Sequence, residues 1–201
     1  MTEIFTIGHS NHSLEKFIFL LCSNAISAVV DIRSSPFCSY ARHFNGEAIK
    51  AALKERGIKY LFLGDALGGK PKEAEFYDET GMALYGKIAG TQKFQEGIKR
   101  LLNGISKHKV ALLCSEENPE NCHRRLLVGR VLQEKGVNII HIRGEGSTQT
   151  EGELADEIKK RSDTRQIGLF KEEGDKDWKS TLSVSPRKAQ ASFSKLSKTQ
   201  K

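Results

Sequence analysis

The fold is decided by residues 110–142, VALLCSEENPENCHRRLLVGRVLQEKGVNIIHI. The stretch opens with VALLC (110–114), an uninterrupted apolar run that is typical of a strand buried on both faces of a sheet. Apolar residues at helical spacing then predict a helix over about 123–135, which ends at a glycine. A second apolar run, VNIIHI (137–142), follows directly. This order predicts a parallel βαβ unit with VALLC near the centre of the sheet.

The same alternation continues on both sides of this unit. Short β-rich runs predict three further strands, at residues 3–7, 28–32 and 58–62. Apolar residues at helical spacing predict helices at 14–22, 46–56, about 94–105 and 150–161. Residues 64–90 form a long, polar and glycine-rich connection. We therefore expect an α/β fold: a mostly parallel five-stranded sheet with helices on both faces.

Charge divides the chain into unequal parts. The net charge is +7, but residues 178–201 contain six basic and no acidic residues, so residues 1–177 carry only +1. The last segment is also rich in serine and lacks apolar periodicity, which predicts a disordered basic tail. The expected organisation is an α/β domain at 1–145, a helical extension at 146–177 and the tail at 178–201.

The sequence shows no sign of a membrane segment or an export signal. It has no run of about eighteen apolar residues, and the N-terminal MTEIFTIGHSN lacks a charged signal region. Four cysteines, at positions 22, 38, 114 and 122, follow no CxxC spacing. We therefore expect a cytoplasmic protein with reduced thiols and no membrane partner.

Most of the chemically capable residues gather in the loops that follow four of the expected strands. These loops are GHSNHS (8–13), RSSPFCSYARHFN (33–45), LGDALGG (63–69) and CSEENPENCHRR (114–125). Ligands of parallel α/β sheets bind beyond the carboxyl ends of the strands. The four loops are therefore expected to converge on one cleft.

The fourth loop is the richest in candidate catalytic residues. Cys122 and His123 lie at the expected start of a helix, where free N–H groups lower the pKa of a thiol. Cys122 is the candidate nucleophile, and His123, Glu116 or His9 is the candidate proton carrier. The alternative is that Cys122 fills a turn and Cys114 packs in the core.

A second set of residues is expected to bind the substrate. Its members are Ser10, Asp31, Arg33, Ser34, Gly68, Gly69 and Arg124. The two arginines and the backbone N–H groups of the glycines suit an anion, although ALGGKP lacks the full spacing of a phosphate loop. Alternatively, Asp31 pairs with Arg33 or His9 for structural reasons, since a buried carboxylate needs a partner.

Metal binding is a further alternative. Cys114, Cys122, His123 and His9 carry suitable donor atoms. The C-x₇-C-H spacing, however, matches none of the common zinc patterns. We therefore predict no metal ligand from the sequence, and the cofactor is left open.

Five motifs follow one another along the chain: TIGHSN, VVDIRSSP, YLFLGDALGG, LLCSEENPENCHR and GVNIIHI. Over about residues 2–143 this ordered set resembles the bacterial and archaeal domain-of-unknown-function family DUF488. The resemblance implies an α/β domain with GHS, DIRS, LGG and CHR at one site, and it implies no particular reaction. The strands ending in DIR and in Cys are also similar to those of rhodanese-like sulfurtransferases. Cys114 lies too far from Arg124, and Cys122 too close to it, for more than a similarity of fold.

These observations favour an enzyme, a hydrolase or transferase, that acts on a phosphate-bearing substrate such as a nucleotide or nucleic acid. One alternative is a non-enzymatic module that binds nucleic acid through the basic tail at 178–201. Another is a Cys/His protein that binds a metal or transfers sulfur. The sequence does not indicate the oligomeric state.

Overall fold

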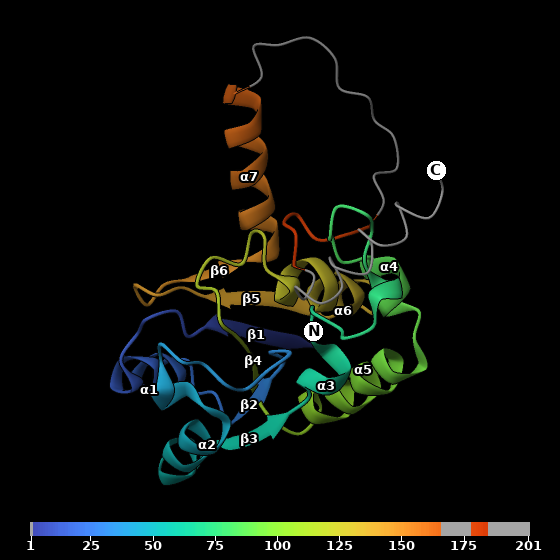
Figure 1. Cartoon of the computed structure of the whole chain (residues 1–201). Coiled ribbons are helices and arrows are strands. Elements are labelled where there is room, and N and C mark those ends of the chain that lie inside the picture. The colour runs from blue at the N-terminus through green and yellow to red at the C-terminus, as the bar shows by residue number, and fades with distance from the viewer. Residues whose placement is uncertain (1, 166–177, 185–201) are drawn as a thin grey trace, which may run out of the picture.

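The computed structural model describes residues 2–165 and 178–184, and within them the chain forms one six-stranded sheet (Figure 1). The strands are β1 (Glu3–Gly8), β2 (Ala28–Asp31), β3 (Lys59–Phe62), β4 (Val110–Cys114), β5 (Asn138–Ile142) and β6 (Thr148–Thr150). Their order across the sheet is β3-β2-β4-β1-β5-β6. The first five are parallel, whereas β6 runs antiparallel to β5. The mostly parallel sheet is confirmed, but the predicted strand number is one too low, because β6 is a short polar TQT segment without apolar alternation.

The helices also follow the predicted alternation. They are α1 (Leu14–Ser23), α2 (Gly46–Glu55), α3 (Gly64–Leu67), α4 (Tyr85–Ala89), α5 (Gln92–Ile105), α6 (Arg130–Glu134) and α7 (Glu151–Arg165). Two short 3-10 helices, η1 (Arg42–Phe44) and η2 (Ala74–Phe76), lie in the loops. The helix predicted over about 123–135 is present, but its first part is a π-helix, η3 (Arg124–Gly129). In Figure 1, α7 rises from the β6 end of the sheet and extends away from the other helices.

Helices cover both faces of the sheet, as predicted. On one face α1, α2 and η1 contribute the buried side chains Phe17, Leu20, Leu21, Phe44, Ile49 and Leu53. On the other face α3, α4, α5, η3 and α6 contribute, among others, Leu67, Tyr85, Phe94, Ile98, Leu127 and Leu132. The core is therefore two apolar layers with the sheet between them.

Strand β4 lies inside the sheet, where its apolar sequence predicts it. All five of its residues are buried, and it pairs with β1 on one side and β2 on the other. The register places Cys114 opposite Gly8 and Leu113 opposite Asp31. Because parallel strands end at the same edge, the loops after β1, β2 and β4 meet there.

Residues 178–184 differ from the expected disordered tail, because they pack against the domain. The indole N–H of Trp178 donates to the carbonyl oxygen of Leu126 at 2.7 Å, and the ring lies under the Arg130 guanidinium. Ser180 is buried and bonds to the backbone of Ala83. The remainder of the expected tail, 185–201, and residues 166–177 of the expected extension lie outside the described residues.

A membrane-spanning segment is not found among the helices of the described part, since none combines sufficient length with sufficient apolar character.

Candidate functional site

Two polar clusters lie at the carboxyl edge of the sheet, one on each face. Side chains alternate along a strand, so Cys114 shares the face of Leu112, which packs with α5 and α6. Asp31 shares the face of Val29, which packs with α1 and α2. The four loops thus converge at one edge, but their polar residues divide between its two sides.

The first group, which we call the thiol cluster, consists of Cys114, Cys122 and His123. The Cys122 thiol donates to the Cys114 sulfur at 3.2 Å. Nδ1 of His123 lies 3.6 Å from the Cys114 sulfur and 3.9 Å from the Cys122 sulfur. Nε2 of His123 lies 3.0 Å from the carbonyl oxygen of Ile32, to which it must donate its proton. In the neutral ring, the lone pair of Nδ1 therefore faces the two sulfurs.

The pKa values within the thiol cluster diverge. The hydrogen bond from Cys122 and the nearby His123 and Arg124 hold the pKa of Cys114 well below its usual range, although burial opposes this. The same hydrogen bond, together with burial, raises the pKa of Cys122. Burial lowers the pKa of His123, but Cys114 and the carbonyl of Ile32 raise it by more. Cys114, and not Cys122, is thus the sulfur that the surroundings favour as a thiolate.

Arg124 is fully buried and holds the fourth loop in place. Its guanidinium donates to the carbonyl oxygens of Glu116 and Glu117. The loop passes directly over β1, where a Cβ at Gly8 would fall 1.8 Å from the Glu116 oxygen. The close approach at this point requires a glycine.

The second group, which we call the Asp31 cluster, contains the predicted pair of Asp31 and Arg33. The guanidinium contacts the carboxylate at 2.6 Å and also donates to the carbonyl oxygen of Phe44. The Tyr60 hydroxyl donates to the same carboxylate at 2.8 Å. Burial and the carboxylate raise the pKa of Tyr60. The Asp31 carboxylate is completely buried and is satisfied by these partners.

His9 lies beside the Asp31 cluster with one nitrogen unpaired. Its Nδ1 donates to the carbonyl oxygen of Ser10 at 2.9 Å, and its ring stacks on Phe44 at 4.5 Å. Its Nε2 is buried and has no hydrogen-bond partner in the part of the chain that is described. Burial lowers the pKa of His9, which leaves a neutral ring with Nε2 as an acceptor.

A cavity of about 830 Å³ lies beside the carboxyl ends of β2 and β3. Its charged lining residues are Lys70, Lys72, Lys93, Asp65, Glu73 and Glu75. Phe62 and Phe76 add apolar surface, and Thr91 and Lys93 place the start of α5 in its wall. The predicted residues Ser34 and Gly68 both line this cavity.

One short segment, Gly68–Lys70, separates the cavity from the thiol cluster. The backbone N–H of Lys70 donates to the Ser34 hydroxyl at 2.9 Å, which fixes the segment to the loop after β2. On its other side, a Cβ at Gly69 would fall 2.6 Å from the Cβ of His123. The cavity and the thiol cluster therefore share a wall.

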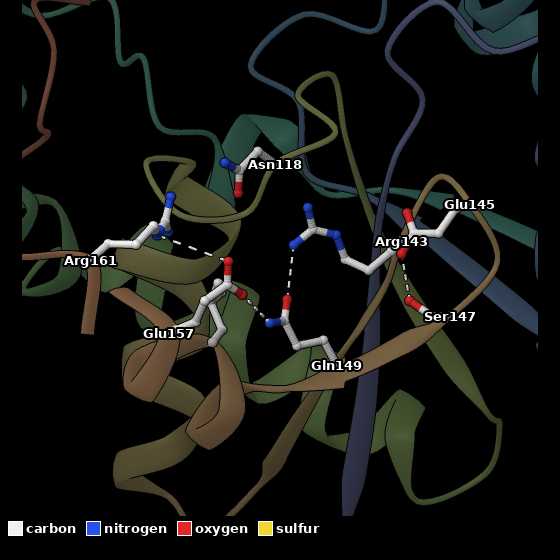
Figure 2. Close-up of a pocket in the computed structure, with 8 residues that line it drawn as sticks. Asn118, Arg143, Glu145, Ser147, Gln149, Glu157 and Arg161 are labelled. Carbon is white, nitrogen blue, oxygen red and sulfur yellow. Dashed lines mark hydrogen bonds and ion pairs between the residues drawn. The ribbon is translucent and has the colours of Figure 1, made fainter. Parts of the chain in front are cut away.

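Figure 2 shows a second pocket, of about 280 Å³, between the β5–β6 turn and α7. Its charged groups already bond to one another. Arg143 donates to Gln149 at 2.9 Å, Gln149 donates to Glu157 at 2.8 Å, and Arg161 lies 3.9 Å from Glu157 (Figure 2). The polar groups that line this pocket are thus already paired with one another.

The structure distributes the predicted site residues over three places. The thiol cluster and its supporting loop contain Glu116, Cys122, His123 and Arg124. The opposite face carries His9, Ser10, Asp31 and Arg33, and the cavity wall carries Ser34 and Gly68. Gly69 is buried behind this wall and lies against His123. Glu116 is exposed at its surface, but partial desolvation of its carboxyl group and the nearby Cys114 raise its pKa. Both arginines bond to groups of the protein itself.

Several notable residues were not singled out as site residues from the sequence. From the sequence, Tyr60 is predicted to be an ordinary strand residue, and Lys72 and Lys93 are predicted to be exposed to solvent. The sequence alone favours a core role for Cys114, because it ends an apolar strand. Its place at the end of a strand, where parallel sheets bind ligands, is the one signal that favours a functional role.

The thiol cluster can support two kinds of chemistry. A thiolate beside an imidazole is the arrangement of a nucleophilic cysteine with its base. Two sulfurs and an imidazole nitrogen are also the donors that a soft divalent metal prefers. The described residues contain three such donor atoms within 4.8 Å of one another at this place.

Comparison with known proteins identifies the family. A family model described as "Domain of unknown function DUF488" matches residues 13–131, which is more than half of the chain. The match includes DIRSSP, LGG and CSEENPENCHR, whereas TIGHSN and GVNIIHI lie outside it. Neither a curated protein nor a solved structure matches the chain. On the extent of the family match and the ordered motifs it contains, the chain belongs to the DUF488 family.

Proposed function

We propose that the protein is an enzyme, a hydrolase or transferase, that acts on a phosphate-bearing substrate bound in the 830 Å³ cavity. The observation that carries this proposal is the shared wall at Gly68–Lys70. It places a cavity with room for a nucleotide-sized ligand next to a buried group of reactive side chains.

Lysines are the anion-binding groups in this proposal. Lys70, Lys72 and Lys93 line the cavity, and Lys93 lies in the first turn of α5, where free N–H groups also favour an anion. The acidic side chains of the lining, such as Glu73, suit sugar hydroxyls or amino groups of a base. A nucleotide carries both kinds of group.

The arginines take a different part from the one that the sequence suggests. Arg33 is held by Asp31 and Phe44, and Arg124 by the carbonyls of the fourth loop. We assign them to positioning: Arg33 stiffens the loop after β2, and Arg124 fixes the loop that leads to Cys122. Phosphate contacts then come from the lysines.

The reacting groups come from the thiol cluster, with Glu116 at its exposed rim as the proton carrier. His123 touches both sulfurs, and Gly69 lies directly against it. A substrate in the cavity therefore reaches the cluster past the Gly68–Lys70 segment. Displacement of this segment is the motion that the proposal requires.

The test is titration calorimetry of the full chain with nucleoside monophosphates, nucleoside triphosphates and inorganic phosphate. Lys70→Ala and Lys93→Ala should each weaken binding by roughly 10- to 150-fold, because a hydrogen bond to a charged group contributes roughly 1.5–3 kcal/mol. The matched control is Lys99→Ala, an exposed lysine of the same helix outside the cavity lining. Absence of binding, or equal weakening by Lys99→Ala, would refute the proposal.

A further inference from the structure

We propose that Cys114, Cys122 and His123 bind a soft divalent metal ion of the Zn²⁺ type. The inference deepens the proposed function, because it names the reactive group of the same site. Binding of the ion can nevertheless be measured without any substrate.

The donor atoms already lie at distances that one ion can bridge. The two sulfurs are 3.2 Å apart, and Nδ1 lies 3.6 and 3.9 Å from them. Zn²⁺ binds sulfur at about 2.3 Å and nitrogen at about 2.0–2.1 Å, so tetrahedral ligands lie roughly 3.4–3.8 Å apart. The two sulfurs have to separate by about half an ångström, and Nδ1 has to approach the Cys122 sulfur by a few tenths of an ångström.

The outer contacts of His123 match those of a metal ligand. Its Nε2 donates to the carbonyl oxygen of Ile32 at 3.0 Å, which directs the lone pair of Nδ1 toward the sulfurs. Metal-binding histidines almost always donate their other ring N–H to a carbonyl or carboxylate. Contact with Gly69 adds a steric limit on the ring, so its orientation is fixed before any ion arrives.

Burial and charge also favour an ion at this place. Cys114 is 4% exposed and Cys122 is 1% exposed. Two thiolates in such surroundings are costly, and the nearby guanidinium of Arg124 balances only one of their charges. A divalent cation between two thiolates and a neutral imidazole gives a site with no net charge, and such a site suits this low-dielectric edge of the core.

The ligand set indicates a reactive site and not a purely structural one. Within the described residues, the group of possible ligands at this place has three members, and structural zinc sites almost always have four. Three protein ligands leave one position for water or substrate. A zinc ion lowers the pKa of such a water to about 7, which is the chemistry that hydrolysis of a phosphate-bearing substrate requires.

The two remaining cysteines provide matched controls. Cys22 is exposed on α1 and Cys38 is half-buried in the loop after β2, and neither belongs to the ligand group. The full chain is titrated with Co²⁺ and then with Zn²⁺, with absorption spectroscopy as the readout. We expect one equivalent of Co²⁺ with sulfur-to-cobalt charge transfer and the intense visible bands of a tetrahedral site, and its displacement by Zn²⁺.

The variants decide which residues are responsible. Cys114→Ser and Cys122→Ser should weaken binding by at least about 100-fold, the upper end of the loss caused by removing an outer partner of a ligand. Cys22→Ser and Cys38→Ser should change nothing. Circular dichroism of each variant separates a lost ligand from a lost fold. The titration of the wild type tests the metal site even if one of these variants fails to fold.

Two results would overturn the inference. One is the absence of a charge-transfer band when the reduced wild-type chain is titrated. The other is loss of the band in Cys22→Ser or Cys38→Ser but not in Cys114→Ser. If the metal binds while nucleotides and phosphate do not, the proposed function fails and the metal site stands. The opposite pattern removes the metal site alone.

Discussion

Gly69 lies so close to His123 that a Cβ at position 69 would fall 2.6 Å from both Cβ and Cγ of the histidine. Position 69 therefore has no room for a side chain. The neighbours of Gly69 in the segment, Gly68 and Lys70, line the cavity, whereas His123 belongs to the thiol cluster. A change on one side of this contact must therefore be felt on the other. The substrate-binding role of Gly69 stays a prediction, whereas its contact with His123 lets it set the distance between the Gly68–Lys70 segment and the thiol cluster.

Gly69→Ala should displace either His123 or the Gly68–Lys70 segment. Crowding of this kind typically destabilises a protein by about 1–3 kcal/mol, and urea denaturation should show a loss in this range. Co²⁺ affinity should fall together with stability. Gly104→Ala is the control, because no atom lies within 4 Å of the added Cβ and the residue is inside α5. It should be neutral or stabilising by up to about 1 kcal/mol.

Arg124→Lys should destabilise the protein although it keeps the charge. The buried guanidinium donates from two separate nitrogens to the carbonyls of Glu116 and Glu117, and the single ammonium group of a lysine cannot reproduce this geometry. Each carbonyl left without a partner costs about 1–3 kcal/mol, so the free energy of unfolding should fall by at least about 2 kcal/mol. Arg100→Lys, at an exposed site on α5, should stay within about 0.5 kcal/mol of the wild type. Equal stabilities of the two variants in urea denaturation would contradict this role of Arg124.

Much of the fold could be predicted from the sequence, because the information is local. Runs such as VALLC and the helical spacing after Ser13 depend on neighbouring residues only, and the Ser13 hydroxyl indeed accepts from the N–H of Lys16 to cap α1. Strand β6 has no such signal. Its pairing with β5 depends on the turn between them, which no apolar pattern marks.

The site was less predictable, because its distances are set by the paths of loops. Cys114 and Cys122 meet only because residues 115–121 fold back over the end of β4 into a π-helix. Likewise, Lys72 and Lys93 line one cavity because of the path that the long connection takes. In a sequence, a single lysine is indistinguishable from a lysine that is simply exposed to solvent. The pair of Asp31 and Arg33 was predictable, since the two residues are neighbours on one strand end.

Tyr60→Phe should lower stability at neutral pH and change its alkaline dependence. The lost hydrogen bond to buried Asp31 costs about 1.5–3 kcal/mol, since its acceptor is charged. The pKa of Tyr60 is raised above its usual value near 10, so the contribution is complete below about pH 10 and declines as the pH rises above it. The wild type should therefore lose stability more steeply than Tyr60→Phe as the pH rises from about 10 to about 12. If urea denaturation shows that the free energies of unfolding of the wild type and Tyr60→Phe fall in parallel with rising pH, the pKa of Tyr60 is the same in the folded and unfolded chains.

Asp78→Asn should loosen residues 178–184 from the domain. Partial burial alone would raise the pKa of Asp78, but hydrogen bonds from Thr80, the Met82 N–H and Lys179 lower it to about 2. The carboxylate therefore contributes stability above its unfolded pKa of 3.8, and this contribution is lost as the pH falls toward about 2.

Trp178 is the single tryptophan of the chain and reports on this segment directly. In Asp78→Asn at neutral pH, acrylamide should quench its fluorescence more strongly than in the wild type, because the ion pair to Lys179 at 3.0 Å is gone. The difference should shrink as the pH falls from about 4 toward 2, where the wild-type carboxylate also becomes protonated. Glu47→Gln serves as the control, because the ion pair of Glu47 with Lys50 on α2 is exposed and distant from Trp178 in sequence. Equal quenching in the wild type and Asp78→Asn at every pH would mean that Trp178 and Ser180 hold the segment without help from the ion pair.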